Sequence, residues 1–395
     1  MIELSARVRT MTSSPTLKLV QIKKQLQAQG KVILDFGAGE PDFPTPENIK
    51  NAGVAAIQGN FTKYTPTAGI AELKKAIQAS YLAEQGYEAR DNQIVVSPGS
   101  KYGLFLLLQA LIDPGDEVIV PLPYWVSYPE MVKFCGGLVV YADHMRPDRL
   151  FELTADSYIS RYSARTKAVI VNSPSNPTGK VMSGGELAEL IAFFHKKNIL
   201  VIVDDCYRKI IYTDGEYPSP LNLVAAAREQ VAVVSSLSKT YAMTGWRLGY
   251  TIASEAVVAA MTKIQEHSTS NPSSISQKAA VEALSGDQGQ VRAMVQEYRR
   301  RRDYFARRVD EIGGITYALP DGAFYFFADF SRHIQRKKFK DDNQLAMDIL
   351  EKLNIILVPG SAFGAPNHLR ISYATSMQDI QEGLGKLEEY LRHEG

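Results

Sequence analysis

Cysteine is scarce in this sequence, which has only Cys135 and Cys206 among its 395 residues. Both stand beside strand-like stretches, which favours buried, reduced thiols over a disulfide bridge or a metal pair. Long apolar runs are also missing, because the longest, 104–108, falls far short of the roughly 20 residues that cross a bilayer. The first stretch, MIELSARVRT, lacks the apolar core of a signal peptide. We therefore expect a cytoplasmic protein without a metal site.

The sequence carries no excess of charge of either sign. Its 44 basic and 43 acidic residues leave a formal net charge of +1, and 45% of the residues are hydrophobic. This composition is typical of a soluble globular protein, with no electrostatic attraction to nucleic acid or membranes, so small-molecule partners are expected. The basic run 299–302 stands among Glu297, Asp303, Asp310 and Glu311, which favours a solvated helix face over a nucleic-acid site.

Internal repeats, low-complexity tracts and flexible linkers are absent, so the organisation follows from the rhythm of predicted elements. Strands with all-apolar interiors alternate with helices, which predicts an α/β fold with a mainly parallel sheet covered on both faces. Beyond about residue 285 a long charged helix, an aromatic strand and a further helix predict a second, smaller α+β domain. The expected strands of the first part are 93–97, 117–121, 167–172, 199–205 and 231–236, and its helices are 71–85, 101–111, 126–134 and 185–197.

One lysine stands out in the stretch SSLSKTYAMTGWRLG, residues 235–249. Lys239 follows a predicted buried strand, at the strand end where ligands bind in open α/β sheets. An amine there can form an imine with an aldehyde cofactor, and Ser236 and Arg247 suit a phosphate dianion, so the stretch fits pyridoxal phosphate. A surface lysine beside a paired arginine is the simpler alternative. Residues 236–239 also fit the S-x-x-K of serine acyl-transfer enzymes, but the companion motifs K-T-G and S-D-N are missing.

Other polar residues suit the same cofactor. Asp204 ends an apolar strand and could pair with a pyridinium nitrogen, which would keep the ring an electron sink. Tyr207 could reach the phenolic oxygen, and the loop NSPSNPTG would present Asn176 in a fixed, extended conformation. A helix cap for Asp204, core packing for Tyr207 and a plain turn around Asn176 are the alternatives.

Backbone amides and an aromatic ring complete the pattern. The stretch SPGSK joins a strand to a helix start, so the amides of Gly99, Ser100 and Lys101 could bind a phosphate. Trp125 follows the next strand and could stack on a flat heterocycle, although core packing would also explain it.

Position decides between these interpretations. Five of the residues, each after a different predicted strand, should meet at one end of the sheet, and five coincidences are improbable. These residues are Lys101, Trp125, Asn176, Asp204 and Lys239.

Nearly the whole chain resembles the class I aminotransferases of pyridoxal-phosphate fold type I, and most closely the bacterial aspartate aminotransferases that include aspartate/prephenate enzymes. The fold type implies a large domain with a mainly parallel sheet and a smaller α+β domain. The motifs that carry the resemblance are AGEPDF (38–43), KYTPTAGI (63–70), PYWVSYPEM (123–131), NSPSNPTG (172–179), DDCY (204–207), SLSKTYAMTGWRLGY (236–250) and LRISYA (369–374).

The resemblance implies a role for each matching residue. Lys239 would be the Schiff-base lysine and proton shuttle, and Asp204 the pyridinium partner. Arg370 would clamp the substrate α-carboxylate, and Lys101 would help to bind a distal carboxylate. The remaining assignments are Tyr207 and Asn176 to the phenolic oxygen; Trp125 to the ring; Ser236, Arg247 and the amides at 99–101 to the phosphate; and Gly39 to a segment that closes over substrate.

The resemblance also implies an assembly and a reaction. Tyr64 would reach the phosphate of a second subunit, which makes the protein a homodimer with shared active sites. A large cofactor-binding domain would span 46–285, with 1–45 and 286–395 forming the small domain. The implied reaction is ping-pong transamination between L-aspartate and 2-oxoglutarate, which gives oxaloacetate and L-glutamate.

Two departures from the family pattern and several alternatives remain. Relatives that use prephenate carry a basic residue where this chain has Thr12, which puts that activity in doubt. Asp205 replaces the commoner glutamate but keeps the acid. The open alternatives are an aminotransferase for an aromatic, alanine or prephenate donor and a pyridoxal-phosphate lyase. A ligand-sensing regulator on the same fold would need a DNA-binding helix pair, and only a short segment precedes Ala38.

Overall fold

A computed structural model describes residues 2–9, 11–12, 15–213 and 217–392. Its centre is a seven-stranded sheet in which the five predicted strands are present and parallel to one another. Two further strands were not predicted. β4 lies at the edge of the sheet, and β8 runs antiparallel between β2 and β7. In sheet order the strands are β2 (Ile94–Ser97), β8 (Gly249–Ile252), β7 (Val231–Ser236), β6 (Leu200–Asp204), β5 (Thr166–Asn172), β3 (Glu117–Leu122) and β4 (Leu138–Asp143).

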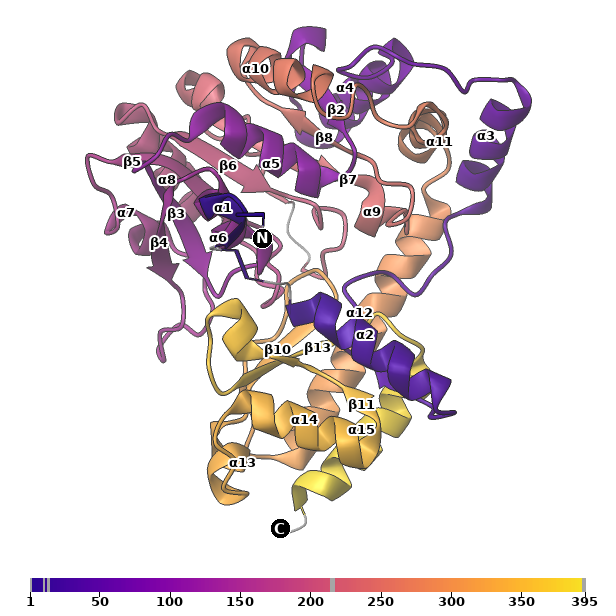
Figure 1. Cartoon of the computed structure of the whole chain (residues 1–395), viewed down its shortest axis with the longest axis vertical. Coiled ribbons are helices and arrows are strands. Elements are labelled where there is room, and N and C mark those ends of the chain that lie inside the picture. Colours follow the sequence, from indigo (N-terminus) through magenta and orange to yellow (C-terminus); the bar gives the residue numbers. More distant parts are fainter. Residues whose placement is uncertain (1, 10, 13–14, 214–216, 393–395) are drawn as a thin grey trace.

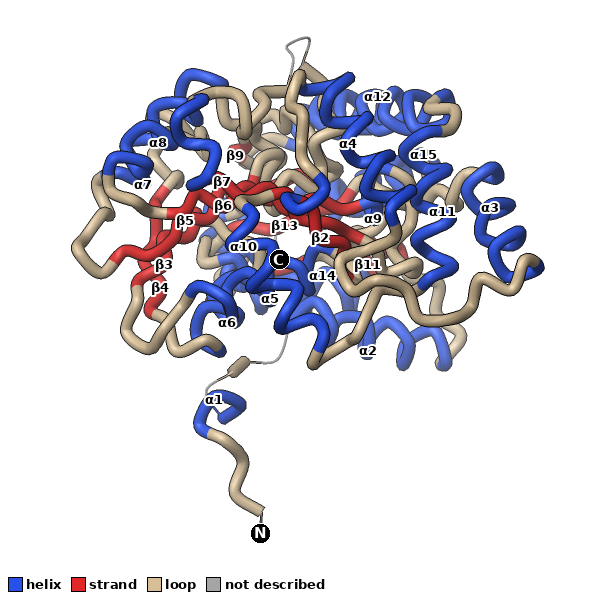
Figure 2. Tube along the Cα trace, turned by 90° about the horizontal axis from the view of Figure 1, so that it is seen from above, coloured by secondary structure: helices blue, strands red, loops and turns tan. Residues whose placement is uncertain are grey.

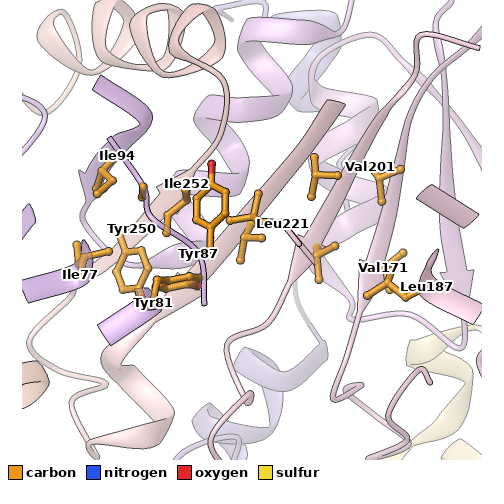
Figure 3. Packing of buried hydrophobic residues seen from close by; sticks show 14 of the residues in the cluster. Ile77, Tyr81, Tyr87, Ile94, Val171, Leu187, Val201, Leu221, Tyr250 and Ile252 are labelled. Carbon is orange, nitrogen blue, oxygen red and sulfur yellow. The ribbon is translucent and has the colours of Figure 1, made fainter. Parts of the chain in front are cut away.

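Both faces of this sheet are buried, as the all-apolar strands predict. Alternate residues of one strand face opposite sides, so Val201 and Val203 of β6 belong to one core cluster and Leu200 and Ile202 to another. Figure 2 shows α4 (Ala71–Gln85) and α8 (Gly184–Lys196) on one side of the sheet, with α5 (Ser100–Leu111) and α6 (Ser127–Phe134) on the other. Figure 3 shows the first cluster, where Tyr81 of α4 lies beside Tyr250 of β8.

Helices and short turns complete this part of the molecule. Five α-helices of this part, α3, α7, α9, α10 and α11, were not among the predicted helices, and α11 packs against both α3 and α4. The remaining elements are α3 (Glu47–Gln58), η1 (Asp91–Gln93), α7 (Ala155–Ile159), η2 (Ala225–Gln230), α9 (Leu237–Thr240), α10 (Glu255–Glu266) and α11 (Ser274–Ser285).

A second group of elements surrounds a smaller antiparallel sheet, ordered β12-β13-β10-β9. The long helix α12 (Gly289–Ile312) leads into it, and a separate aromatic-rich core joins its helices and strands (Figure 1). The other elements are β9 (Thr316–Tyr317), β10 (Tyr325–Asp329), α13 (Ser331–Arg336), α14 (Asp342–Leu353), β11 (Ile355–Ile356), β12 (Val358–Pro359), η3 (Gly360–Phe363), β13 (His368–Ser372) and α15 (Met377–Arg392).

The amino-terminal segment joins this second group. It contains α1 (Ala6–Arg9), α2 (Pro15–Ala28) and β1 (Leu34–Asp35), and β1 pairs in parallel with β11 far along the chain. Leu34 and Phe36 belong to the same core as α12 and α15. This pairing agrees with a small domain made from both ends of the chain, while the boundaries at 46 and 286 stay a prediction.

Two predictions about charged and thiol residues need correction. The expected solvated face at 299–302 is wrong for Arg301 and Arg302, which are buried. Arg301 bonds to the Asp42 carboxylate at 2.8 Å, so this arginine ties α12 to the amino-terminal segment. Cys135 and Cys206 are free thiols, but both are partly exposed rather than buried. Within the described ranges no three metal-ligating side chains gather, and no helix is long and apolar enough to cross a membrane.

Candidate active site

The predicted site residues meet in one cavity of about 610 Å³ at the carboxyl ends of the parallel strands. Segments from both ends of the chain close it, including 37–40 after β1 and Arg370 of β13. Eleven of the thirteen predicted residues line the cavity. They are Gly39, Ser100, Lys101, Trp125, Asn176, Asp204, Tyr207, Ser236, Lys239, Arg247 and Arg370.

The other two predicted residues lie outside the cavity wall. Gly99 is the residue before α5, where its φ of 86° suits glycine, and an added Cβ there would lie 2.6 Å from the Arg247 guanidinium. Tyr64 is 89% exposed on this chain. A tyrosine so exposed is available to another molecule, and its predicted contact across a subunit interface stays a prediction.

Lys239 sits in α9, the short helix that follows β7. Its Nζ donates a hydrogen bond to the carbonyl oxygen of Gly39 at 2.5 Å, so the segment after β1 covers the amine. Burial lowers the pKa of Lys239 to about 8. Near that pH about half of the amines are uncharged, which makes Lys239 able to act as a nucleophile or a base.

Asp204 is the last residue of β6, and it is a buried residue of the cavity wall. The Tyr128 hydroxyl donates to one carboxylate oxygen at 2.7 Å, and the backbone N–H of Cys206 donates to the other at 3.3 Å. Burial raises the pKa of Asp204, whereas these two hydrogen bonds lower it. A cation or a protonated ring nitrogen in the cavity would compensate the buried charge.

Arg370 is a buried cation whose hydrogen-bond acceptors are neutral. Its Nη1 donates to Asn176 Oδ1 at 3.1 Å and its Nη2 donates to the carbonyl oxygen of Gly37 at 2.8 Å, while its buried Nε has no partner. The guanidinium lies 4.5 Å from the ring centroid of Tyr325. Burial lowers the pKa of Arg370, but a guanidinium stays charged. A carboxylate in the cavity would supply the charged partner that Arg370 lacks.

A second group of lining residues suits an anion. The helix α5 begins at Ser100, so its first amides point outward with the positive end of the helix dipole. Arg247 and the Ser236 hydroxyl line the same region, and Gly249 lets the two backbones approach, because a Cβ there would lie 2.4 Å from the Ser100 nitrogen. These groups suit a phosphate dianion.

Trp125 and Lys101 lie close together on the cavity wall. The Lys101 Nζ stands 4.9 Å from the centre of the Trp125 ring, and burial lowers the pKa of Lys101, with the Arg247 charge adding to the effect. The ring of Trp125 packs edge-on against Tyr128, which holds it at the cavity wall. Lys101 is exposed to solvent and lines the cavity, and its contact with a substrate carboxylate stays a prediction.

Several residues that line the cavity were not predicted from the sequence. Tyr128 lies inside the quoted motif PYWVSYPEM, and a buried strand-end carboxylate calls for such a donor, so a search for the partner of Asp204 could have found it. Tyr325, whose hydroxyl pairs with that of Tyr207 at 2.8 Å, comes from the second sheet, and no local signal placed it here. Lys23 and Asp35 also line the cavity.

The family model described as "Aminotransferase class I and II" matches residues 31–387. The chain belongs to this family. It is 41% identical to the aspartate/prephenate aminotransferase of Nitrosomonas europaea, over 98% of this chain and 100% of the relative. It is 39% identical to the aspartate aminotransferase of Bacillus sp. strain YM-2, over 98% of this chain and 99% of the relative.

Solved structures agree with this membership. The crystal structure of the aspartate aminotransferase from Rhizobium meliloti matches 99% of both chains with a TM-score of 0.94 and 36% identity. The predicted α/β aminotransferase fold is therefore confirmed, and this chain is an aminotransferase. The serine acyl-transfer interpretation of residues 236–239 is superseded, because the lysine stands in an aminotransferase motif.

Proposed function

We propose that this aminotransferase uses pyridoxal phosphate to transfer the amino group of L-aspartate to 2-oxoglutarate. The cavity fits this cofactor. The α5 amino terminus with Ser236 and Arg247 would hold the phosphate, Trp125 the ring face, and Asp204 the ring nitrogen. Bound covalently to Lys239 through its aldehyde, the cofactor would supply an electron sink for the carbanion left when an amino acid loses its α-proton.

The side chains around the ring would divide the remaining work. Asp204 would keep the ring nitrogen protonated, since its buried carboxylate is stabilised by Tyr128 and gains from a cationic neighbour. Asn176 accepts from Arg370 through Oδ1, so its Nδ2 would donate to the ring oxygen together with the Tyr207 hydroxyl. The Lys239 amine would move the α-proton, because its lowered pKa permits both uptake and release near neutral pH.

The observation that carries the substrate assignment is that Arg370 and Lys101 line one cavity. Arg370 offers a preorganised fork for the α-carboxylate, and Lys101 adds a second positive charge that could bind a distal carboxylate. A dicarboxylic amino acid and a dicarboxylic 2-oxo acid would use both. We infer that both substrates use the same groups in turn, which gives ping-pong kinetics.

Assembly and location complete the proposal. The exposed Tyr64 would complete the phosphate site of a partner subunit in a homodimer. We also infer a cytoplasmic location, because the two cysteines are free thiols and the cytoplasm keeps thiols reduced.

The test of the proposal is a panel of amino donors at saturating cofactor, with 2-oxoglutarate as acceptor. We expect kcat/KM to be highest for L-aspartate and at least about tenfold lower for aromatic and aliphatic donors, since these cannot use a distal cation. A preference for a neutral donor would refute the substrate assignment. Cysteine, which carries a sulfur leaving group, tests the lyase alternative: pyruvate, ammonia and sulfide formed from it without an acceptor would favour that alternative.

Replacing Arg370 with lysine should raise KM for every amino-acid substrate by about tenfold to hundredfold, because an ammonium cannot copy a bidentate fork. Steady-state kinetics with aspartate and a neutral donor measure this. Arg300→Lys, at an exposed position of α12 paired with Glu297, is the matched control and should keep the wild-type constants. An Arg370→Lys effect on a single donor would contradict the clamp.

Lys101→Ala should separate dicarboxylic from neutral donors. Losing one charge-assisted contact costs about 1.5 to 3 kcal/mol, which is roughly a tenfold to hundredfold loss in kcat/KM. We expect that loss for aspartate and glutamate, with little change for a neutral donor at saturating cofactor. Equal losses for all donors would show that Lys101 serves the phosphate rather than the substrate side chain.

A further inference from the structure

One ion pair on the cavity wall has no part in the chemistry proposed above. Lys23 of α2 and Asp35 of β1 both line the cavity, and the Lys23 Nζ bonds to Asp35 Oδ2 at 2.8 Å. The pair is largely screened from water, with exposed side-chain fractions of 31% and 18%.

Asp35 connects this pair to Arg370, the proposed clamp for the substrate α-carboxylate. Its Oδ1 accepts the backbone N–H of Gly37 at 2.9 Å, and the carbonyl oxygen of Gly37 accepts from Arg370 Nη2 at 2.8 Å. A continuous path therefore runs from Lys23 through Asp35 and Gly37 to Arg370. The carboxylate of Asp35 also acts on Arg370 through space, where it opposes the effect of burial on the pKa of Arg370.

An uncompensated carboxylate at this position would harm the clamp. Arg370 has only neutral acceptors, Asn176 and Gly37, which leaves its charge available to an incoming anion. The negative charge of Asp35 would repel that anion across a partly desolvated cavity, where charges are screened less than in water. Lys23 neutralises Asp35 at short range and removes this repulsion.

We propose that Lys23 is a positioning residue that compensates Asp35 and thereby sets the affinity of the Arg370 clamp for substrate carboxylates. The inference rests on the proposed function, because it takes Arg370 as the carboxylate site. It also links α2 to substrate binding, since only a seated α2 brings Lys23 to Asp35. Asp35 has a use of its own in this arrangement, because it fixes the Gly37 backbone that orients Arg370.

A double-mutant cycle tests this proposal on the cofactor-loaded protein. The variants are Lys23→Met, which keeps the length of the side chain, Asp35→Asn, which keeps an acceptor for Gly37, and the two combined. Lys24→Met removes the same charge from the next, exposed position of α2 and is the matched control. Calorimetry measures the dissociation constant of maleate, an unreactive dicarboxylate, and steady-state kinetics measure KM and kcat for aspartate.

Charge compensation predicts a particular order of affinities. Lys23→Met should weaken maleate binding and raise KM by about tenfold, with kcat within about twofold of wild type. Asp35→Asn and Lys24→Met should bind maleate about as tightly as wild type or more tightly. The combined variant should recover to within about threefold of wild type, because no unpaired carboxylate remains.

Other results would overturn the proposal. A combined variant as weak as Lys23→Met would mean that Lys23 contacts the anion itself or only packs α2. If Asp35→Asn binds maleate more weakly than wild type, the charge of Asp35 helps Arg370 to bind the carboxylate, and the proposal is wrong. This variant alone decides whether the Asp35 charge opposes maleate binding if Lys23→Met does not fold. A wild-type protein that binds no maleate would also overturn the inference. If maleate binds but aspartate is not transaminated, the proposed function fails and the inference about Lys23 still stands on calorimetry.

Discussion

Lys239→Ala should lose at least about a thousandfold in kcat, because its buried amine is the group proposed both to bind the cofactor aldehyde covalently and to move the α-proton. The variant should also lose the absorbance of the covalently held cofactor. It should keep some cofactor through Ser236, Arg247 and the α5 amino terminus, which do not depend on the lysine. Absorbance spectra, phosphate analysis of the desalted protein and steady-state kinetics measure the three effects.

The control for this variant is a lysine outside the cavity. Lys278→Ala breaks an exposed ion pair with Glu72 and should leave both the spectrum and the turnover unchanged. Near-normal transamination by Lys239→Ala would contradict the whole account of the site. Complete loss of cofactor would contradict only the independent phosphate site.

Asp204→Ala should lower kcat by about a hundredfold or more, because a ring nitrogen without its buried counter-charge is a poor electron sink. Cofactor should remain bound through Lys239 and the phosphate site. The substitution also leaves the Tyr128 hydroxyl without its buried acceptor, which costs about 1 to 3 kcal/mol of stability. Single-turnover kinetics at full cofactor occupancy separate the chemical step from the loss of stability.

Two further variants locate the effect of Asp204. Asp204→Glu keeps the charge and should be milder than Asp204→Ala. Tyr128→Phe removes the same hydrogen bond but keeps the carboxylate, so its loss in kcat should be much smaller. If Tyr128→Phe were as slow as Asp204→Ala, the hydrogen bond rather than the charge would carry the role. Full turnover by Asp204→Ala would contradict the pairing with the ring nitrogen.

Much of the large sheet could be predicted from the sequence, because its buried strands are apolar throughout and each is followed by a helix. β4 was missed because it is a half-exposed edge strand, with Leu138 and Tyr141 open to solvent. The antiparallel β8 lies between β2 and β7, and such an insertion depends on long-range packing rather than on local pattern. Arg301 and Arg302 were placed on a solvated face because their acceptors, the Asp42 carboxylate and the Pro320 carbonyl oxygen, lie far away in sequence or in the backbone.

The part of the candidate site that lies on the large sheet could be predicted from the positions of its strand ends. Lys101, Asn176, Asp204 and Lys239 follow parallel strands, so one rule places them together. Arg370 belongs to another sheet and was assigned only by the family resemblance. The pairing of Tyr207 with Tyr325 and of Lys23 with Asp35 depends on how the two groups of elements pack, which no local pattern encodes.

The most direct test of the proposed reaction is a half-reaction without acceptor. Cofactor-loaded protein is mixed with L-aspartate alone, oxaloacetate is counted per active site, and the protein is desalted to remove the remaining aspartate before 2-oxoglutarate is added. The account predicts about one oxaloacetate per site and then about one L-glutamate after the addition, as ping-pong transfer requires. Continuous product release without 2-oxoglutarate, or no oxaloacetate at all, would contradict it.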